Sequence, residues 1–133
     1  LVLLDDAGKI ASYADVPDIA LDLIEVADKP TTIIYPGAKR LAPNLIAEDG
    51  TIGIRITREE FTRSLIFRYN KPIVSTSANI SGEPSPHFFG EISEEIKNAV
   101  DYIVDYRRND HKPAAPSSII KLGMGGEIQI IRK

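Results

Sequence analysis

The sequence predicts a mixed β-sheet flanked by helices, a fold of the α/β or α+β class. Segments with strand and helix patterns alternate from the beginning of the chain to about residue 105. Two strand-like segments at the end, 118–122 and 128–131, are joined by a glycine-rich turn at 123–126. Alternation of this kind is typical of sheets that pack helices against their faces. Because the 133 residues contain no repeat and no linker composition, we expect a single domain over residues 1–133.

The first half of the chain supplies a strand, a helix and a second strand. The apolar run Leu1–Leu4 is interpreted as a strand. Apolar residues then recur between 16 and 27 at helical spacing, with Asp15 placed to cap the helix and Pro17 in its first turn. Thr31–Tyr35 is β-branched and aromatic and ends at Pro36-Gly37, which predicts a strand.

The second half continues the alternation. Isoleucines alternate with polar residues over 51–56, which predicts a half-buried strand. Thr57 and Glu60 have capping-box spacing, and the helix after them is expected to turn Phe61, Leu65 and Tyr69 inward. Further strands are expected at 72–76 and 102–104, and a helix capped by Ser93 between them.

Composition excludes several classes of protein. The chain is 43% hydrophobic and 26% charged, so it has enough apolar residues for a packed core. The net charge of -3 argues against nucleic-acid binding through bulk charge, and the basic cluster 107–112 is interpreted as a solvated loop. Without cysteine there are no disulfides and no thiolate zinc sites. No apolar run approaches the roughly 18 residues that cross a bilayer, and we expect a cytoplasmic protein without membrane contact.

The common catalytic and phosphate-binding motifs are absent. The sequence contains no P-loop, no G-x-G-x-x-G, no H-E-x-x-H and no G-x-S-x-G. His87 and His111 lie far apart, which disfavours a metal pair or a serine-histidine dyad. We therefore expect no protein-held metal and no covalent or acid-base catalytic group.

Arg55 is expected to need an anionic partner. It alternates with isoleucines on a predicted strand, and an unpaired buried guanidinium is costly. Its partner is either a carboxylate of the protein or the carboxylate of a ligand held by the guanidinium fork. The spacing does not decide between them.

The segment 75–86, STSANISGEPSP, follows a predicted strand directly. Small hydroxyl residues and Gly82 allow backbone amides to approach an anion closely, and the two prolines fix the exit of the loop. The same composition is also common in loops without function. The segment is therefore compatible with an anion pocket and with a plain turn.

Four sequence blocks carry a resemblance to a known family. They are KPTTIIYPGAKRLAPNL (29–45), TIGIRI (51–56), PIVSTSANISGEPSP (72–86) and PSSIIKL with EIQIIRK (116–133). In this order they resemble the YrdC family, the threonylcarbamoyl-AMP synthases of tRNA modification. The resemblance implies a twisted mixed sheet around a concave cavity. It also implies a reaction that joins L-threonine, bicarbonate and ATP into threonylcarbamoyl-adenylate and releases pyrophosphate. A partner transferase would then carry the group to tRNA.

The resemblance also implies roles for residues that match the family pattern. The positions that would hold threonine are Arg55, Ser75 and Ser117. The positions that would contact ATP are Thr51, Ser77, Ser85 and Arg132, while Asn79 would shape the turn. Mg²⁺ would accompany the triphosphate, held mostly by phosphate oxygens and water.

One part of the family pattern has no counterpart in this chain. The family carries a lysine-x-arginine motif on an early strand that contacts the phosphates, and Lys39-Arg40 lacks the intervening residue. By family spacing the motif is expected just upstream of Leu1, so the resemblance implies an N-terminally incomplete domain. Two alternatives to the synthase stay open. One is a related module that binds double-stranded RNA or tRNA, and the other is a carbamoyl-transfer paralogue.

Overall fold

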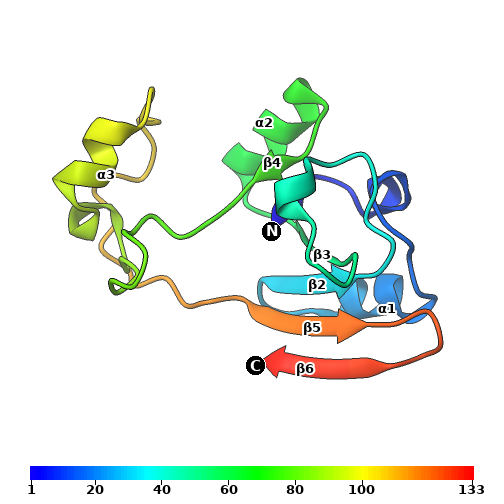
Figure 1. Ribbon diagram of the computed structural model, residues 1–133. Coiled ribbons are helices and arrows are strands. Elements are labelled where there is room, and N and C mark those ends of the chain that lie inside the picture. The colour runs from blue at the N-terminus through cyan, green and yellow to red at the C-terminus, as the bar shows by residue number, and fades with distance from the viewer. The chain divides into compact units, whose positions relative to one another are not determined.

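The computed structural model describes all residues 1–133 and divides them into two compact units. The first unit combines residues 1–75 with 117–133, and the second is 76–116. All six strands belong to the first unit (Figure 1). The expectation of a single domain over the whole chain stays a prediction, and the two units are described separately.

The first unit is built on one mixed sheet of six strands. The strands are β1 (Val2–Leu4), β2 (Thr31–Tyr35), β3 (Ile52–Ile56), β4 (Ile73–Val74), β5 (Ser118–Leu122) and β6 (Ile128–Arg132). Their order across the sheet is β4-β1-β3-β2-β5-β6. The pairs β1–β3 and β2–β5 are parallel, and the other three pairs are antiparallel. The predicted fold class is confirmed.

One face of the sheet carries the hydrophobic core. Alternate side chains of a strand point to opposite faces, so the paired residues Val2, Ile54 and Ile33 share a face. The fully buried strand residues of this core are Val2, Leu4, Ile33, Tyr35, Ile52, Ile54 and Leu122. Ile10, Ala14 and Ala20, which lie between β1 and β2, complete this core. The other face carries Arg55 and Thr32 together with apolar residues such as Leu3 and Ile34.

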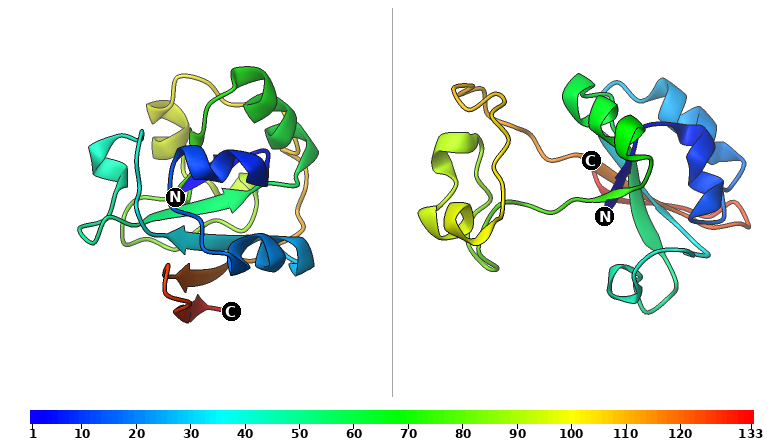
Figure 2. Two further views of the ribbon diagram at one scale, coloured as in Figure 1. Left: turned by 90° about the vertical axis from the view of Figure 1, so that its right-hand side faces the viewer. Right: turned by 90° about the horizontal axis from the view of Figure 1, so that it is seen from above.

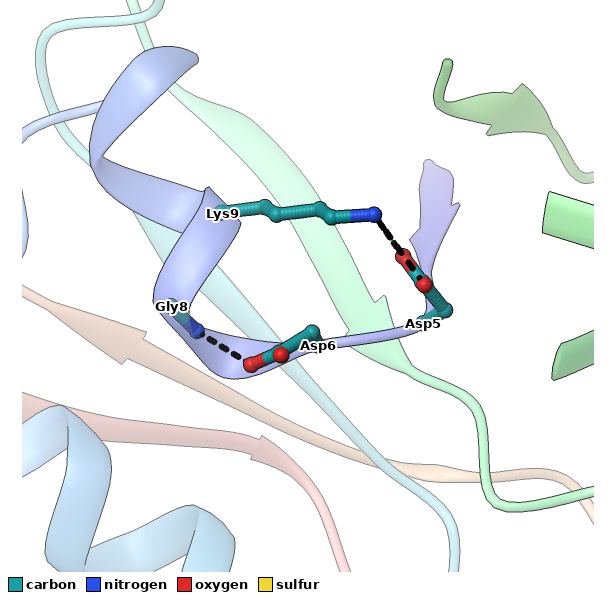
Figure 3. A network of polar contacts seen from close by, with 4 residues as sticks. All are labelled: Asp5, Asp6, Gly8 and Lys9. Atoms are coloured by element: carbon teal, nitrogen blue, oxygen red, sulfur yellow. Dashed lines mark hydrogen bonds and ion pairs between the residues drawn. The ribbon is translucent and has the colours of Figure 1, made fainter. Parts of the chain in front are cut away.

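A 3₁₀ helix that the sequence pattern did not predict, η1 (Ala7–Ser12), follows β1 and lies beside the sheet (Figure 2). Its first turn is capped by Asp6, whose carboxylate accepts a hydrogen bond from the amide of Gly8 at 2.8 Å (Figure 3). The neighbouring Asp5 is buried and pairs with Lys9 at 3.0 Å. Ile10 can therefore be buried completely while the polar ends of η1 remain satisfied.

The helix α1 (Ile19–Val26) begins later than the sequence pattern indicates. Asp15 does not cap it, because the helix starts after Asp18. The carboxylate of Asp15 lies instead against Gly37, where any Cβ would collide with it. This glycine also has a positive φ of 66°. The turn after β2 therefore requires glycine for two reasons, the space that Asp15 occupies and the backbone conformation.

The expected capping box of α2 (Glu60–Tyr69) is wrong. Glu59 is the N-cap, and its carboxylate accepts hydrogen bonds from the amides of Phe61 and Thr62 at 3.2 and 2.8 Å. Ile66 is the one buried residue of the helix, whereas Phe61, Leu65 and Tyr69 are exposed by 36 to 56%. The Glu59 carboxylate satisfies free amides of the first turn, the role that the sequence pattern gave to the Thr57 hydroxyl.

The second unit contains two short helices, η3 (Phe89–Glu91) and α3 (Glu94–Ala99). Ser93 caps α3 as predicted by accepting a hydrogen bond from the amide of Ile96 at 3.4 Å. The strand expected at 102–104 does not form. No residue between 76 and 116 is buried, so this unit has no core of its own. No helix of either unit is both long enough and apolar enough to cross a bilayer.

Candidate functional site

A row of polar side chains crosses the face of the sheet opposite the core. Arg55 on β3 pairs with Thr32 on β2, and Thr32 pairs with Ile119 on β5. Ile119 in turn pairs with Arg132 on β6. Directly paired residues point to the same face, so four adjacent strands bring Arg55, Thr32 and Arg132 to one side.

A β-bulge brings Arg132 into this row. Ile128 and Ile130 pair with Leu122 and Ile120 on the core face, and strict alternation would place Arg132 with them. The register shifts between Ile119 and Ile120, so that Arg132 lies opposite Ile119 instead. A bulge is a usual device for re-aiming a side chain near a site.

Arg132 and Thr32 meet at Ser117, the residue just before β5. The Nε of Arg132 donates to the carbonyl oxygen of Ser117 at 2.7 Å, and its Nη2 donates to the Ser117 hydroxyl at 3.3 Å. The Thr32 and Ser117 hydroxyl oxygens are 3.2 Å apart and share a hydrogen bond. Ser117 and Thr32 are 7% and 3% exposed, so this cluster is nearly free of solvent.

Arg55 has no carboxylate partner in the protein. It takes part in none of the six ion pairs of the chain, and its Nε is buried without a hydrogen-bond acceptor. The internal salt bridge that the sequence left open is therefore not formed. A guanidinium nitrogen in this state costs free energy unless an acceptor from outside the chain reaches it.

Electrostatics at the cluster favour an anion. Burial lowers the pKa of Arg55 below its ordinary value, and repulsion from Arg132 lowers this pKa further. An arginine stays protonated at neutral pH even so, which leaves two positive charges near each other without a counter-charge. A carboxylate or phosphate would relieve the repulsion and accept the free N–H donors at once.

Ser75 and Ser117 lie on opposite sides of Arg55, each two strands away from it. Ser75 follows β4, and its amide donates to the carbonyl oxygen of Leu1 at 3.0 Å. By alternation its side chain has the same facing as Ile73 and Leu3, and Leu3 pairs with Arg55. Ser75 therefore borders the face that carries Arg55.

Thr51 lies at the opposite end of β3 from Arg55. Its hydroxyl donates to the Asp49 carboxylate at 2.6 Å, and its amide donates to the same oxygen at 3.2 Å. Lys121 pairs with the other oxygen of Asp49 at 2.6 Å. The hydrogen bonds from Lys121 and Thr51 lower the pKa of Asp49 to about 2. The Thr51 hydroxyl is thus already hydrogen-bonded within the turn that precedes β3.

In the second unit, Asn79 ties the turn 79–85 together. Its side-chain amide donates to the carbonyl oxygens of Ile80 and Glu83 at 3.0 Å each. Its oxygen accepts a hydrogen bond from the Ser85 hydroxyl at 3.4 Å. Ser77 is exposed. These three predicted site residues, Ser77, Asn79 and Ser85, all belong to the second unit.

A cavity of about 350 Å³ lies elsewhere in the first unit, where α1 ends and α2 begins. It is lined by residues 27–31 and 54–59 together with Ile24, Ile33 and Tyr35. Arg55 belongs to this lining, but Ser75, Ser117 and Arg132 do not. The cavity and the charged cluster therefore share Arg55 but none of these three residues. No group of three or more His, Asp or Glu residues in residues 1–133 is arranged to hold a metal.

Sequence reasoning missed Thr32. Nothing in TTIIY distinguishes this threonine from its neighbour, because the register between β2 and β3 decides which of the two faces Arg55. The β-bulge of β6 was missed for the same reason.

Comparisons with known proteins identify the family of the chain. The sequence model of the Sua5/YciO/YrdC family, described as "Telomere recombination", matches residues 1–133. A putative threonylcarbamoyl-AMP synthase of Methanocaldococcus jannaschii is 38% identical over 122 residues, covering 91% of this chain and 56% of the relative. A threonylcarbamoyl-AMP synthase of Pseudoalteromonas translucida is 26% identical over 132 residues, covering 96% of this chain and 69% of the relative.

Solved structures show the same fold. YciO of E. coli superposes with a TM-score of 0.80 at 21% identity, over 99% of this chain and 64% of that chain. A variant of Sua5 from P. abyssi superposes with a TM-score of 0.73 at 25% identity, over 91% and 35%. The chain thus spans little more than half the length of the M. jannaschii relative. With a family match over its whole length, the chain belongs to the Sua5/YciO/YrdC family.

Proposed function

We propose that this chain is the catalytic domain, or a part of it, of an L-threonylcarbamoyl-adenylate synthase. In this reaction the amino group of L-threonine combines with bicarbonate and releases water. An oxygen of the resulting carbamate then displaces pyrophosphate from the α-phosphorus of ATP. The observation that carries the proposal is the half-buried Arg55, whose buried Nε has no hydrogen-bond acceptor, which has no carboxylate partner within the protein and which lies near a second arginine.

The amino-acid side of the site belongs to Arg55, Ser75 and Ser117. The arginine fork takes the carboxylate of L-threonine, and the two serines lie on either side of it. By the family resemblance we assign Thr51, Ser77, Ser85 and Arg132 to contacts with ATP, and Asn79 holds the turn that contains Ser85. Because Thr51 already donates to Asp49, its contact with ATP would use an oxygen lone pair or require a rotated hydroxyl.

Catalysis in this proposal needs no covalent nucleophile. The residues hold the reactants next to each other and neutralise the charge that develops on the phosphates. Mg²⁺ would reach the site on the triphosphate, bound by phosphate oxygens and water. We further propose that residues 1–133 act as one domain in the cytoplasm and that tRNA is served through a partner transferase.

The experiment is an assay of pyrophosphate release. The protein is incubated with ATP, Mg²⁺ and bicarbonate, and with either L-threonine or L-serine, and the adenylate is identified by mass spectrometry. We expect release that depends on both L-threonine and bicarbonate, and little release with L-serine. An RNA-binding module or a carbamoyl-transfer paralogue would give no threonine-dependent release, and such a result refutes the synthase.

A further inference from the structure

We propose that Thr32 is a positioning residue that fixes the hydroxyl donor offered to the amino-acid carboxylate bound at Arg55. The inference rests on the proposed function, because it assigns a further residue to the same site. Thr32 is not one of the residues that the family pattern points to. We identify it from its contacts with Ser117 and Gly53 and from its pairing with Arg55.

A count of protons at Ser117 carries the argument. A guanidinium only donates hydrogen bonds, so the Ser117 hydroxyl oxygen must accept from Nη2 of Arg132. The hydroxyls of Thr32 and Ser117 together own two protons, and one of these is used in the bond between them. The structure holds no further acceptor for the other. Whichever hydroxyl donates to its neighbour, the pair keeps one O–H for a group outside the chain.

The methyl group of Thr32 fixes the orientation of this side chain. A Cβ built on Gly53 would be 3.4 Å from the Thr32 methyl group, so this methyl packs directly over the glycine. β-Branched side chains have few χ1 rotamers, and placing the methyl on Gly53 turns the hydroxyl of Thr32 toward Ser117. Thr32 is 3% exposed, and water therefore competes little for this bond.

The remaining O–H lies in the same row as Arg55. Thr32 is the direct cross-strand partner of Arg55, and the Nε of Arg55 also lacks an acceptor. Two donors without acceptors on the same face of the sheet match the two oxygens of one carboxylate. We therefore infer that Thr32 orients the neutral hydroxyl donor, while Arg55 supplies the charged donor.

The test compares Thr32→Val with Thr32→Ser. Valine keeps the shape and the methyl contact with Gly53 but removes the hydroxyl, whereas serine keeps the hydroxyl and loses the methyl. Binding of L-threonine is measured by titration calorimetry, and thermal unfolding is recorded for each variant. We expect about fivefold to tenfold weaker binding for Thr32→Val and binding within about twofold of wild type for Thr32→Ser.

A double-mutant cycle makes the result specific to the hydroxyl pair. In a Ser117→Ala background, Thr32→Val is expected to add little further loss, because the shared bond is already gone. The inference is overturned if Thr32→Val binds L-threonine like wild type. It is also overturned if Thr32→Ser is as weak as Thr32→Val, which would assign the effect to the methyl packing. Wild-type protein that binds no L-threonine would overturn the proposed function as well, so the two failures are distinguishable.

Discussion

At the scale of single residues, Arg55 is the most informative side chain of the chain. Its alternation with isoleucines identified it as a charge in an apolar setting, and this could be seen from the sequence. Its lack of an internal partner could not be seen, because it depends on which side chains the neighbouring strands bring to the same face. The sequence left two possible partners for Arg55, a carboxylate of the protein or one of a ligand. The structure excludes the first, because no carboxylate of the chain pairs with Arg55.

The first prediction separates ligand binding from stability at Arg55. In Arg55→Met the fork is lost, and we expect L-threonine binding to weaken by about 1.5–3 kcal/mol, the range for hydrogen bonds to a charged group. The free energy of unfolding is expected to stay equal or to rise, because the guanidinium is half-buried, has a buried Nε without an acceptor and is repelled by Arg132. Calorimetric titration and denaturant unfolding measure the two quantities.

Arg63→Met is the matched control, because Arg63 is exposed on α2 and forms no ion pair. Both its affinity for L-threonine and its stability are expected to match wild type. Unchanged threonine affinity together with lower stability in Arg55→Met would make Arg55 a structural residue and remove the observation on which the proposed function stands.

At the scale of elements, strands were more predictable than helices. Every predicted strand of the first unit forms, because β-branched runs such as TTIIY and alternating runs such as TIGIRI are specific patterns. The strand expected at 102–104 failed because an apolar run becomes a strand only with a hydrogen-bonding partner. The unit that contains it has no other strand.

The position of Arg132 could not follow from alternation. Strict period-two counting puts it on the core face with Ile128 and Ile130, and only the β-bulge next to Ile119 moves it to the face of Arg55. A bulge depends on the pairing of two strands rather than on either sequence. The family pattern pointed to Arg132 as a site candidate, but it did not indicate the bulge that brings this side chain to the face of Arg55.

The second prediction concerns the start of α2. Glu59 accepts two amide hydrogen bonds at the N-terminus, so Glu59→Ala is expected to lower the free energy of unfolding by about 1 kcal/mol. Glu60→Ala is the matched control, since Glu60 lies in the first turn and only interacts with the helix dipole. Chemical denaturation measures both variants. A larger loss for Glu60→Ala than for Glu59→Ala would restore the capping box that spacing suggested.

At the scale of the whole molecule, the stable core and the proposed amino-acid site are in the same unit. Every residue of the hydrophobic core lies in residues 1–75 or 117–133, and so do Arg55, Thr32, Ser117 and Arg132. Residues 76–116 contain no buried side chain and no strand, but they hold two of the proposed nucleotide contacts, Ser77 and Ser85. We therefore expect removal of residues 76–116 to affect ATP binding more than L-threonine binding.

The third prediction replaces residues 76–116 with a flexible linker. The ends to be joined lie on β4 and β5, four positions apart in the sheet, or about 19 Å across it. A Gly/Ser linker of about 20 residues has an end-to-end distance of roughly 25 Å, which also covers the offset along the strands. We expect the shortened protein to unfold cooperatively, as followed by circular dichroism, and to bind L-threonine within a few-fold of the intact chain.

Binding of ATP is expected to be lost in the same protein, because Ser77 and Ser85 are removed. Of the proposed nucleotide contacts only Arg132 and Thr51 remain, and Thr51 already donates to Asp49. The Arg55→Met version of the shortened protein is the control and is expected to bind neither substrate. An unfolded product would show that residues 76–116 contribute to stability without a buried core. A folded product that still binds ATP like the intact chain would remove Ser77 and Ser85 from the nucleotide site. Loss of L-threonine binding in a folded product would place part of the amino-acid site in residues 76–116.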